Sequence, residues 1–169
     1  MTPNARRRAA LAALAAAALA VMATSQRRWT LPHAPLTGTT TIPAGAISAD
    51  QRVAVRLTPA QAFHGQRVSL LLTVAASQTE PAGQRVQPIV RAESEPWTQP
   101  SEGDRDRPVV AEFARACAPG QPCGGTFTVR WTRDATRVGE AVTVRWTLAP
   151  SARGVGDDPA GSLAADTLQ

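Results

Sequence analysis

Short runs in which apolar residues recur at every second position restrict the fold of this chain more than any other feature. Val53, Val55 and Leu57 alternate in this way, with Arg52 and Arg56 between them. Successive side chains of a β-strand point to opposite faces, so a period of two predicts strands with one buried face. After residue 50 no segment combines sustained helical spacing with helix caps. The body of the chain is therefore predicted to be all-β.

The number and spacing of these runs predict two packed sheets. The expected strands, counting an interrupted first one, lie at 39–47, 51–57, 68–74, 86–92, 109–117, 126–132 and 140–148. About seven short strands in about 110 residues are typical of an antiparallel β-sandwich, which we place at residues 38–150. The architecture resembles immunoglobulin-like and fibronectin-like sandwiches in general.

The last two runs are expected to pair as an antiparallel hairpin, because each contains Val-Arg-Trp-Thr in the same inward and outward phase. Trp131 and Trp146 share a face with other apolar residues, which predicts that both indoles lie in the core. Thr and Arg side chains line the opposite face. Residues 133–140 would connect the two strands as a long loop.

The first 23 residues have the layout of an export signal. Arg6–Arg8 precede an uncharged, Ala-rich run, as in the charged and apolar regions of a secretory signal peptide. Small residues place cleavage after Ala23 or Ser25. The alternative is an uncleaved anchor, but this fifteen-residue run would reach only about 22 Å as a helix, against a hydrocarbon core of roughly 30 Å.

Both flanks of the domain are expected to lack regular structure. Residues 24–37 are polar and contain Pro32 and Pro35, so they are predicted to form a linker. Residues 151–169 are rich in Gly, Ala, Asp and Ser, and they are predicted to form a disordered tail.

The two cysteines indicate the compartment. Cys117 and Cys123 are separated by five residues, and an isolated pair in an oxidising compartment most simply forms a disulfide. A metal site would need two more ligands, and redox chemistry of the CxxC type needs a shorter spacing. The pair and the export signal predict an extracytoplasmic protein, either periplasmic, cell-surface or secreted, with a single-pass membrane anchor as the second choice.

The basic composition does not indicate nucleic-acid binding. The chain has 18 Arg and no Lys, but three of the Arg lie in the export segment. After residue 23, 15 Arg stand against 13 acidic residues, a net charge of only +2. An all-Arg complement raises the isoelectric point even when the net charge is small. We expect no nucleic-acid partner, and contact with a membrane only through the N-terminal segment if that segment is retained.

Acidic residues concentrate in one irregular segment, 93–106. Loops at the end of a sandwich can gather carboxylates around Ca²⁺, which makes Glu93, Glu95, Asp104 and Asp106 a candidate calcium site. The Arg residues interleaved with them and the absence of EF-hand spacing favour a solvated, self-neutralising loop instead.

Three residues are candidates for contact with a partner. Trp97 lies outside every alternating run, so it either contacts a partner, as aromatic residues in loops often do, or folds back over an open edge of a sheet. Arg130 and Arg145 lie on the outward face of the expected hairpin, among Thr residues. This face either binds an anionic polymer or a carboxylated surface, or remains solvated.

These features predict an exported, non-catalytic β-sandwich module of the bacterial cell envelope or secretome that binds a protein or a surface polymer. The chain has no nucleophile elbow, phosphate loop or HExxH motif, so we expect neither enzyme activity nor a cofactor. Two alternatives stay open. One is a structural or assembly subunit of an envelope complex, anchored by its N-terminal helix; the other is a small extracytoplasmic hydrolase that uses the acidic segment.

Overall fold

Nine β-strands make up nearly all of the regular structure in the described part of the chain. The structure, a computed structural model, describes residues 27–62, 64–93, 95–98, 107–135 and 139–168. The strands are β1 (Arg28–Pro32), β2 (Leu36–Ile42), β3 (Ser48–Thr58), β4 (Arg67–Glu80), β5 (Val86–Ala92), β6 (Val109–Ala116), β7 (Cys123–Arg133), β8 (Val142–Val155) and β9 (Ser162–Leu168), and one 3-10 helix, η1, spans His64–Gln66. The prediction of an all-β fold is confirmed, while the predicted export helix lies outside the described residues.

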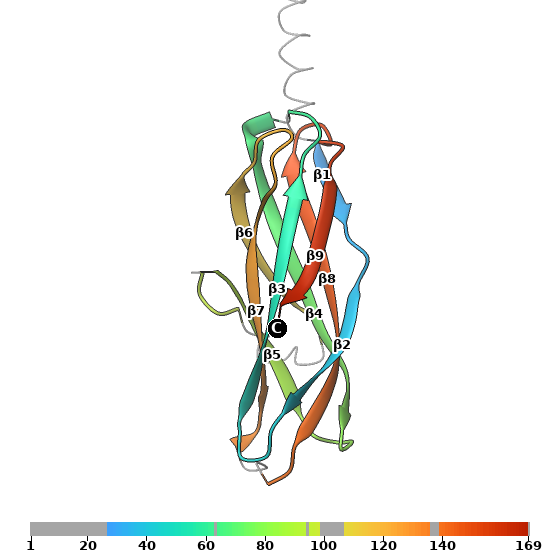
Figure 1. Ribbon diagram of the computed structural model, residues 1–169, viewed down its shortest axis with the longest axis vertical. Coiled ribbons are helices and arrows are strands. Elements are labelled where there is room, and N and C mark those ends of the chain that lie inside the picture. Colours follow the sequence, from blue (N-terminus) through green and yellow to red (C-terminus); the bar gives the residue numbers. More distant parts are fainter. Residues whose placement is uncertain (1–26, 63, 94, 99–106, 136–138, 169) are drawn as a thin grey trace, which may run out of the picture.

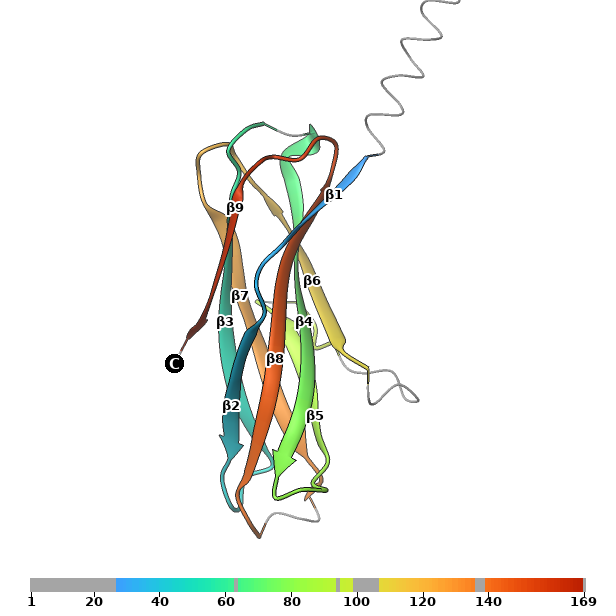
Figure 2. The ribbon, with the colours of Figure 1, turned by 90° about the vertical axis from the view of Figure 1, so that its right-hand side faces the viewer.

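Two antiparallel sheets form the layers of the molecule (Figure 1). In sheet A, β8 is flanked on one side by β4, and β6 pairs with the far side of β4 and forms one edge of the sheet. On the other side of β8, β1 and β2 lie one after the other along the same strand and together form the second edge. Sheet B has the order β5-β7-β3-β9. Figure 2 shows the layers from the side, with β3 and β9 in one layer and β4 and β8 in the other.

The chain changes sheet at every connection from β2 onward. Among the described strands, those that follow one another in sequence therefore never pair with each other. In the immunoglobulin order, by contrast, sequence neighbours such as the first and second strands do pair. The two-sheet architecture is as predicted, but the immunoglobulin-like strand order is not found.

The predicted hairpin is wrong for the same reason. β7 pairs with β3 and β5, whereas β8 pairs with β1, β2 and β4. Trp131 and Trp146 are nevertheless both buried, with exposed fractions of 0% and 5%. The alternation of inward and outward residues is the same for two strands that face each other across a core as for two strands that are hydrogen-bonded side by side. A long connection can span the roughly 10 Å between packed sheets as easily as it can close a hairpin.

The core lies between the sheets and is built from the inward positions of the alternating runs. Its largest fully buried side chains are Trp131, Phe127, Ile42, Leu57, Leu70, Leu72 and Leu148. The guanidinium of Arg133 is also buried, at the end where the β2–β3 and β7–β8 connections meet. It donates hydrogen bonds to the carbonyl oxygens of Ala46 at 2.8 Å, of Pro43 at 2.9 Å and of Glu140.

Both flanks of the domain contain strands where irregular chain was predicted. β8 continues to Val155, and β9 adds to the open edge of β3 with Leu163 and Ala165 packed on the core. β1 and the start of β2 occupy much of the predicted linker. Pro is tolerated on edge strands, because its missing N–H can face solvent. Composition did not predict these strands, because an edge strand is held by hydrogen bonds to the backbone of its neighbour, and composition does not report such pairing.

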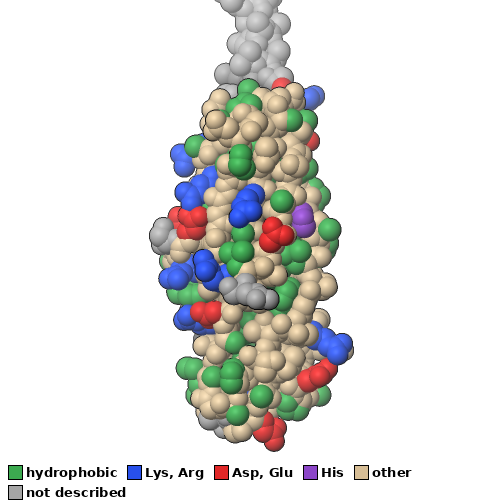
Figure 3. Space-filling model, in the orientation of Figure 1, with side chains coloured by type: hydrophobic (Ala, Val, Ile, Leu, Met, Phe, Trp, Pro, Cys, Tyr) green, Lys and Arg blue, Asp and Glu red, His purple; other side chains and the backbone are tan. Residues whose placement is uncertain are grey.

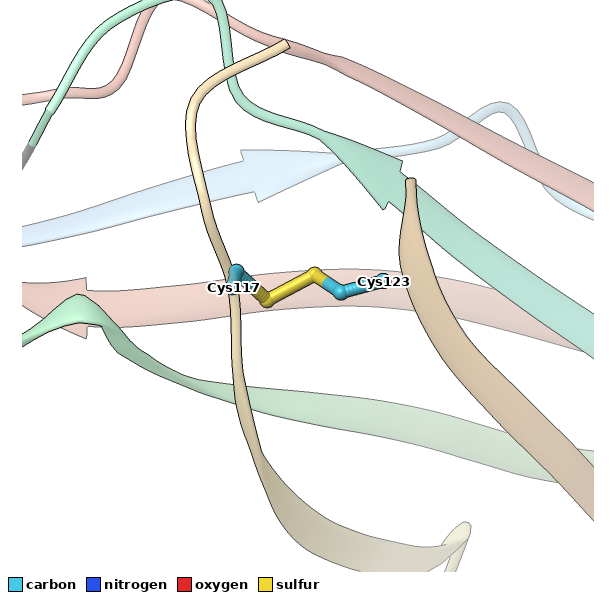
Figure 4. Close-up of a disulfide and its surroundings, with 2 residues drawn as sticks. All are labelled: Cys117 and Cys123. Atoms are coloured by element: carbon cyan, nitrogen blue, oxygen red, sulfur yellow. A yellow bond between two sulfur atoms is a disulfide. The ribbon is translucent and has the colours of Figure 1, made fainter. Parts of the chain in front are cut away.

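The predicted disulfide is present. Cys117 and Cys123 have Cα atoms 5.4 Å apart. Cys117 directly follows β6 of sheet A and Cys123 begins β7 of sheet B, so the bond closes a connection between the two sheets (Figure 4). The disulfide is consistent with an extracytoplasmic location. Within the described ranges, no helix has the length and hydropathy needed to cross a membrane.

Candidate functional site

The structure brings together two of the three predicted contact residues. Trp97 and Arg130 both lie on the outer face of sheet B, where the guanidinium carbon of Arg130 is 4.7 Å from the centre of the indole. Arg145 lies on β8 in sheet A, on the opposite outer face of the sandwich. The Thr- and Arg-rich surface expected from the hairpin is thus divided between two faces that point away from each other.

Trp97 is held over sheet B by backbone hydrogen bonds. Thr98 forms an antiparallel bridge with Val90 of β5, with N–H to O=C distances of 2.7 Å and 3.0 Å. This bridge places Trp97 directly opposite Arg91, because residues one step from an antiparallel pair also face each other. The guanidinium carbon of Arg91 lies 4.8 Å from the centre of the indole. The aromatic ring therefore stacks against two cations, and stacking of this kind is attractive and favours Arg.

Arg130 is also bound to a carboxylate. Its Nε and one terminal nitrogen donate to the two carboxylate oxygens of Asp50 on β3, at 2.7 Å and 2.8 Å. This hydrogen-bonded pairing lowers the pKa of Asp50 below its ordinary value, against a smaller effect of desolvation, and the charge of Arg91 adds to the lowering. Asp50 is thus ionised at neutral pH and is paired with Arg130, while Arg91 acts on it only as a more distant charge.

Three Arg residues on this face, Arg52, Arg56 and Arg91, form no ion pair among the described residues, and two of them, Arg52 and Arg91, lie in one row. The register of β3, β7 and β5 places Arg52, Thr128 and Arg91 in one row across the sheet. Among the described residues, neither Arg52 nor Arg91 forms an ion pair, and the buried Nε of Arg91 has no hydrogen-bond acceptor. Figure 3 shows Arg side chains gathered along the middle and one side of this face.

A shallow groove of about 530 Å³ follows this row. Its lining residues are Asp50, Arg52, Arg91, Glu93, Thr126 and Thr128. A groove of this volume is within the range of small-ligand sites. The guanidinium, carboxylate and hydroxyl groups around it can donate and accept hydrogen bonds over the whole length of the groove.

Of the predicted calcium site, the structure describes only Glu93 and Glu95, so the site stays a prediction. Glu93 forms an ion pair with Arg115 of β6, so it bridges the neighbouring edges of the two sheets. Glu95 is exposed, and Asp104 and Asp106 lie outside the described residues. In the described part of the chain, no group of three or more His, Cys, Asp or Glu is placed to hold a metal ion.

Sheet A carries a larger groove of about 670 Å³, which we consider a weaker candidate. Among its lining residues are Arg28, Arg67, Ser69, Glu112 and Arg153. Arg153 forms an ion pair with Glu112, which also accepts a hydrogen bond from Ser69, and both contacts lower the pKa of Glu112. The only aromatic residue in this groove, Trp29, is buried in the core.

Sequence reasoning missed Asp50, Arg52 and Arg91. Arg52 and Arg91 occupy outward positions of predicted runs, so their orientation was readable from the sequence, whereas Asp50 precedes the run predicted at 51–57 and joins the strand because β3 begins at Ser48. What the sequence lacked was the register, which alone shows that three separate strands bring them together. No protein-family model matches the chain, and a comparison with curated proteins gives no match either.

Proposed function

We propose that this protein is an exported, non-catalytic module of the cell envelope that binds an anionic partner through the outer face of sheet B. One observation carries the proposal. Trp97 is fixed on this face by its backbone bridge and by the guanidinium groups of Arg91 and Arg130. It stands at the end of the row that leads to Arg52, and neither Arg52 nor Arg91 has an ion-pair partner among the described residues. Arg and Trp side chains held in place in this way are the residue types that most often dominate binding energy.

Export is supported by the disulfide and by the N-terminal pattern of charged and apolar residues. The intact mass of the native protein tests it. We expect a chain that begins directly after Ala23 or Ser25. A native mass that includes Met1 would contradict cleavage and favour the anchored form.

Binding can be tested by sedimentation with envelope material from the native host. We expect the wild-type protein to pellet with this material and Arg91→Gln to pellet much less, because the variant loses one of the two unmatched charges that line the groove. Arg145→Gln is the matched control: it removes the same charge from sheet A and should bind like the wild type. Equal binding by all three proteins would refute the assignment of this face.

A further inference from the structure

We infer that the groove on sheet B takes a carboxylated polysaccharide, meaning a linear sugar polymer with carboxylates of the uronic-acid type. The inference rests on the proposed function and names the ligand class for the same face. It follows from the spacing of the unmatched cations, from the polar groups between them and from the placement of Trp97.

The two unmatched cations that line the groove are spaced for a ligand with more than one carboxylate. Arg52 and Arg91 stand in the same row on β3 and β5, with β7 between them, so their Cα atoms are about 10 Å apart, two strand spacings. A guanidinium can bind one carboxylate through two parallel hydrogen bonds. A single small anion would leave one of the two Arg side chains unmatched, whereas a polymer with repeated carboxylates can engage both.

The groups between these cations suit hydroxyls better than further charge. Asp50 and Glu93 line the groove, and each is already paired with an Arg, at 2.7 Å for Asp50. A carboxylate has lone pairs for about four hydrogen bonds, so both can still accept from sugar hydroxyls. Thr126 and Thr128 can donate or accept. A polyphosphate would bring dense negative charge close to both carboxylates, which opposes its binding.

An acidic peptide fits this surface less well. Extended peptides are recognised largely through main-chain hydrogen bonds at the edge of a sheet. The Arg52–Arg91 row lies on a sheet face, where the backbone of the inner strands β7 and β3 is already paired. Recognition on a face depends on side groups, and in an acidic polysaccharide the side groups are carboxylates and hydroxyls.

Trp97 supplies the apolar part of the surface. Its half-buried indole stands at the end of the row, opposite Arg91, and the two stacked guanidinium groups hold it there. Sugar rings have apolar faces that pack against indoles, and a ring held in advance loses little conformational entropy on binding. Because Trp97 also orients Arg91 and Arg130, its removal is expected to weaken binding by more than its contact area suggests.

The test measures binding of the full-length protein to polygalacturonate, polyphosphate, poly-glutamate and neutral dextran of similar length. We expect clear preference for polygalacturonate, and a loss of affinity of about tenfold or more for Arg52→Gln combined with Arg91→Gln. The control combines Arg145→Gln with Arg153→Gln. This variant has the same net charge as the first double variant, but both of its substitutions lie on the outer face of sheet A. It should bind polygalacturonate within about twofold of the wild type, and thermal unfolding should show that both double variants are folded.

The remaining outcomes would overturn the inference. Equal loss in both double variants, or equal affinity for polyphosphate or poly-glutamate, would indicate unspecific attraction by charge. No binding to polygalacturonate would reject the ligand class. The envelope sedimentation assay separates this failure from that of the proposed function: a protein that still pellets with envelope material through Arg91 has another partner, and one that does not pellet lacks the function.

Discussion

The two outer faces of the sandwich have similar side chains but differ in what lies beside their unpaired Arg residues. On sheet A, Arg145 pairs with Glu80 and Arg153 with Glu112, while Arg28 and Arg67 form no ion pair among the described residues and have no exposed aromatic ring beside them. On sheet B, Asp50 is the one described acidic partner of Arg130, while Arg52 and Arg91 remain unmatched in the same patch. Sheet B also has an indole on its outer face, whereas Trp29 and Trp146 of sheet A are buried.

This difference shows why a count of outward Thr and Arg residues does not locate a binding surface. Exposed ion pairs contribute little to stability and leave little charge for a ligand. An excess of guanidinium groups over carboxylates in one patch, next to a fixed aromatic ring, remains available. Variants at matched positions of the two sheets test this difference.

The largest effects are expected for the inward Trp residues of the two sheets. Trp131→Ala in sheet B and Trp146→Ala in sheet A should each lower the free energy of unfolding by about 3–5 kcal/mol, because each leaves a large cavity. The outward Trp97→Ala should cost less than about 1 kcal/mol. Urea denaturation measures all three. If Trp97→Ala cost as much as the other two, Trp97 would be part of the stability of sheet B and not of a binding surface.

Arg133 and Arg130 allow a similar test within one strand. Arg133→Ala removes the donor from the carbonyls of Pro43, Ala46 and Glu140 and should cost about 3 kcal/mol, since buried acceptors without donors are costly. Arg130→Ala removes an exposed pair with Asp50 and should cost less than about 1 kcal/mol. Equal costs measured by chemical denaturation would mean that the outer face of β7 is as important for folding as its inner face.

These same strands show how far the sequence could predict the structure. Alternation gave the strands and the inward phase of Trp131 and Trp146, because period two reports which face a residue occupies. It could not give strand partners, since β7 and β8 would show the same pattern whether paired or facing each other. Trp97 could be suspected as a loop aromatic, but its contacts with Arg91 and Arg130 depend on the return of its segment to β5. That return is a tertiary contact without a local signal.

A third test concerns the edge of sheet A, where Trp side chains cover Gly residues of the paired strand. Trp146 of β8 lies over Gly38 of β2, and Trp29 of β1 lies over Gly154 of β8. A methyl group added at Gly38 would lie 2.5 Å from the indole of Trp146. Gly38→Ala should therefore cost about 2 kcal/mol by overpacking.

The control for this test is Gly139→Ala, because no described atom lies within 4 Å of a methyl group at that position. It should change the free energy of unfolding by less than about 0.5 kcal/mol. Covering a Gly with an aromatic ring stabilises the pairing of an edge strand. If Gly38→Ala were as harmless as the control, the Trp–Gly contact would not be what holds β2 on sheet A.

The smallest expected effects concern the pH dependence contributed by the paired acids. Hydrogen bonds from Arg130 and Arg153 lower the pKa values of Asp50 and Glu112 below their ordinary values of 3.8 and 4.5. A carboxylate with a lowered pKa in the folded state stabilises the protein fully above its ordinary pKa, and it loses this contribution as the pH falls through the folded-state value. Asp50→Asn and Glu112→Gln should each make stability less sensitive to acid below about pH 4.5, by less than about 1 kcal/mol because both pairs are exposed. Thermal unfolding from pH 7 to pH 2.5 measures this change in acid sensitivity.

Equal effects are expected on the two faces, because each variant removes one pair. Arg52 and Arg91 form no ion pair with a described acidic residue, so the protonation of Asp50 and Glu112 does not measure their contribution to binding. A clearly larger acid sensitivity of the Asp50 pair would mean that Arg91 stabilises Asp50 about as strongly as Arg130 does, and less positive charge on sheet B would then be available to a ligand.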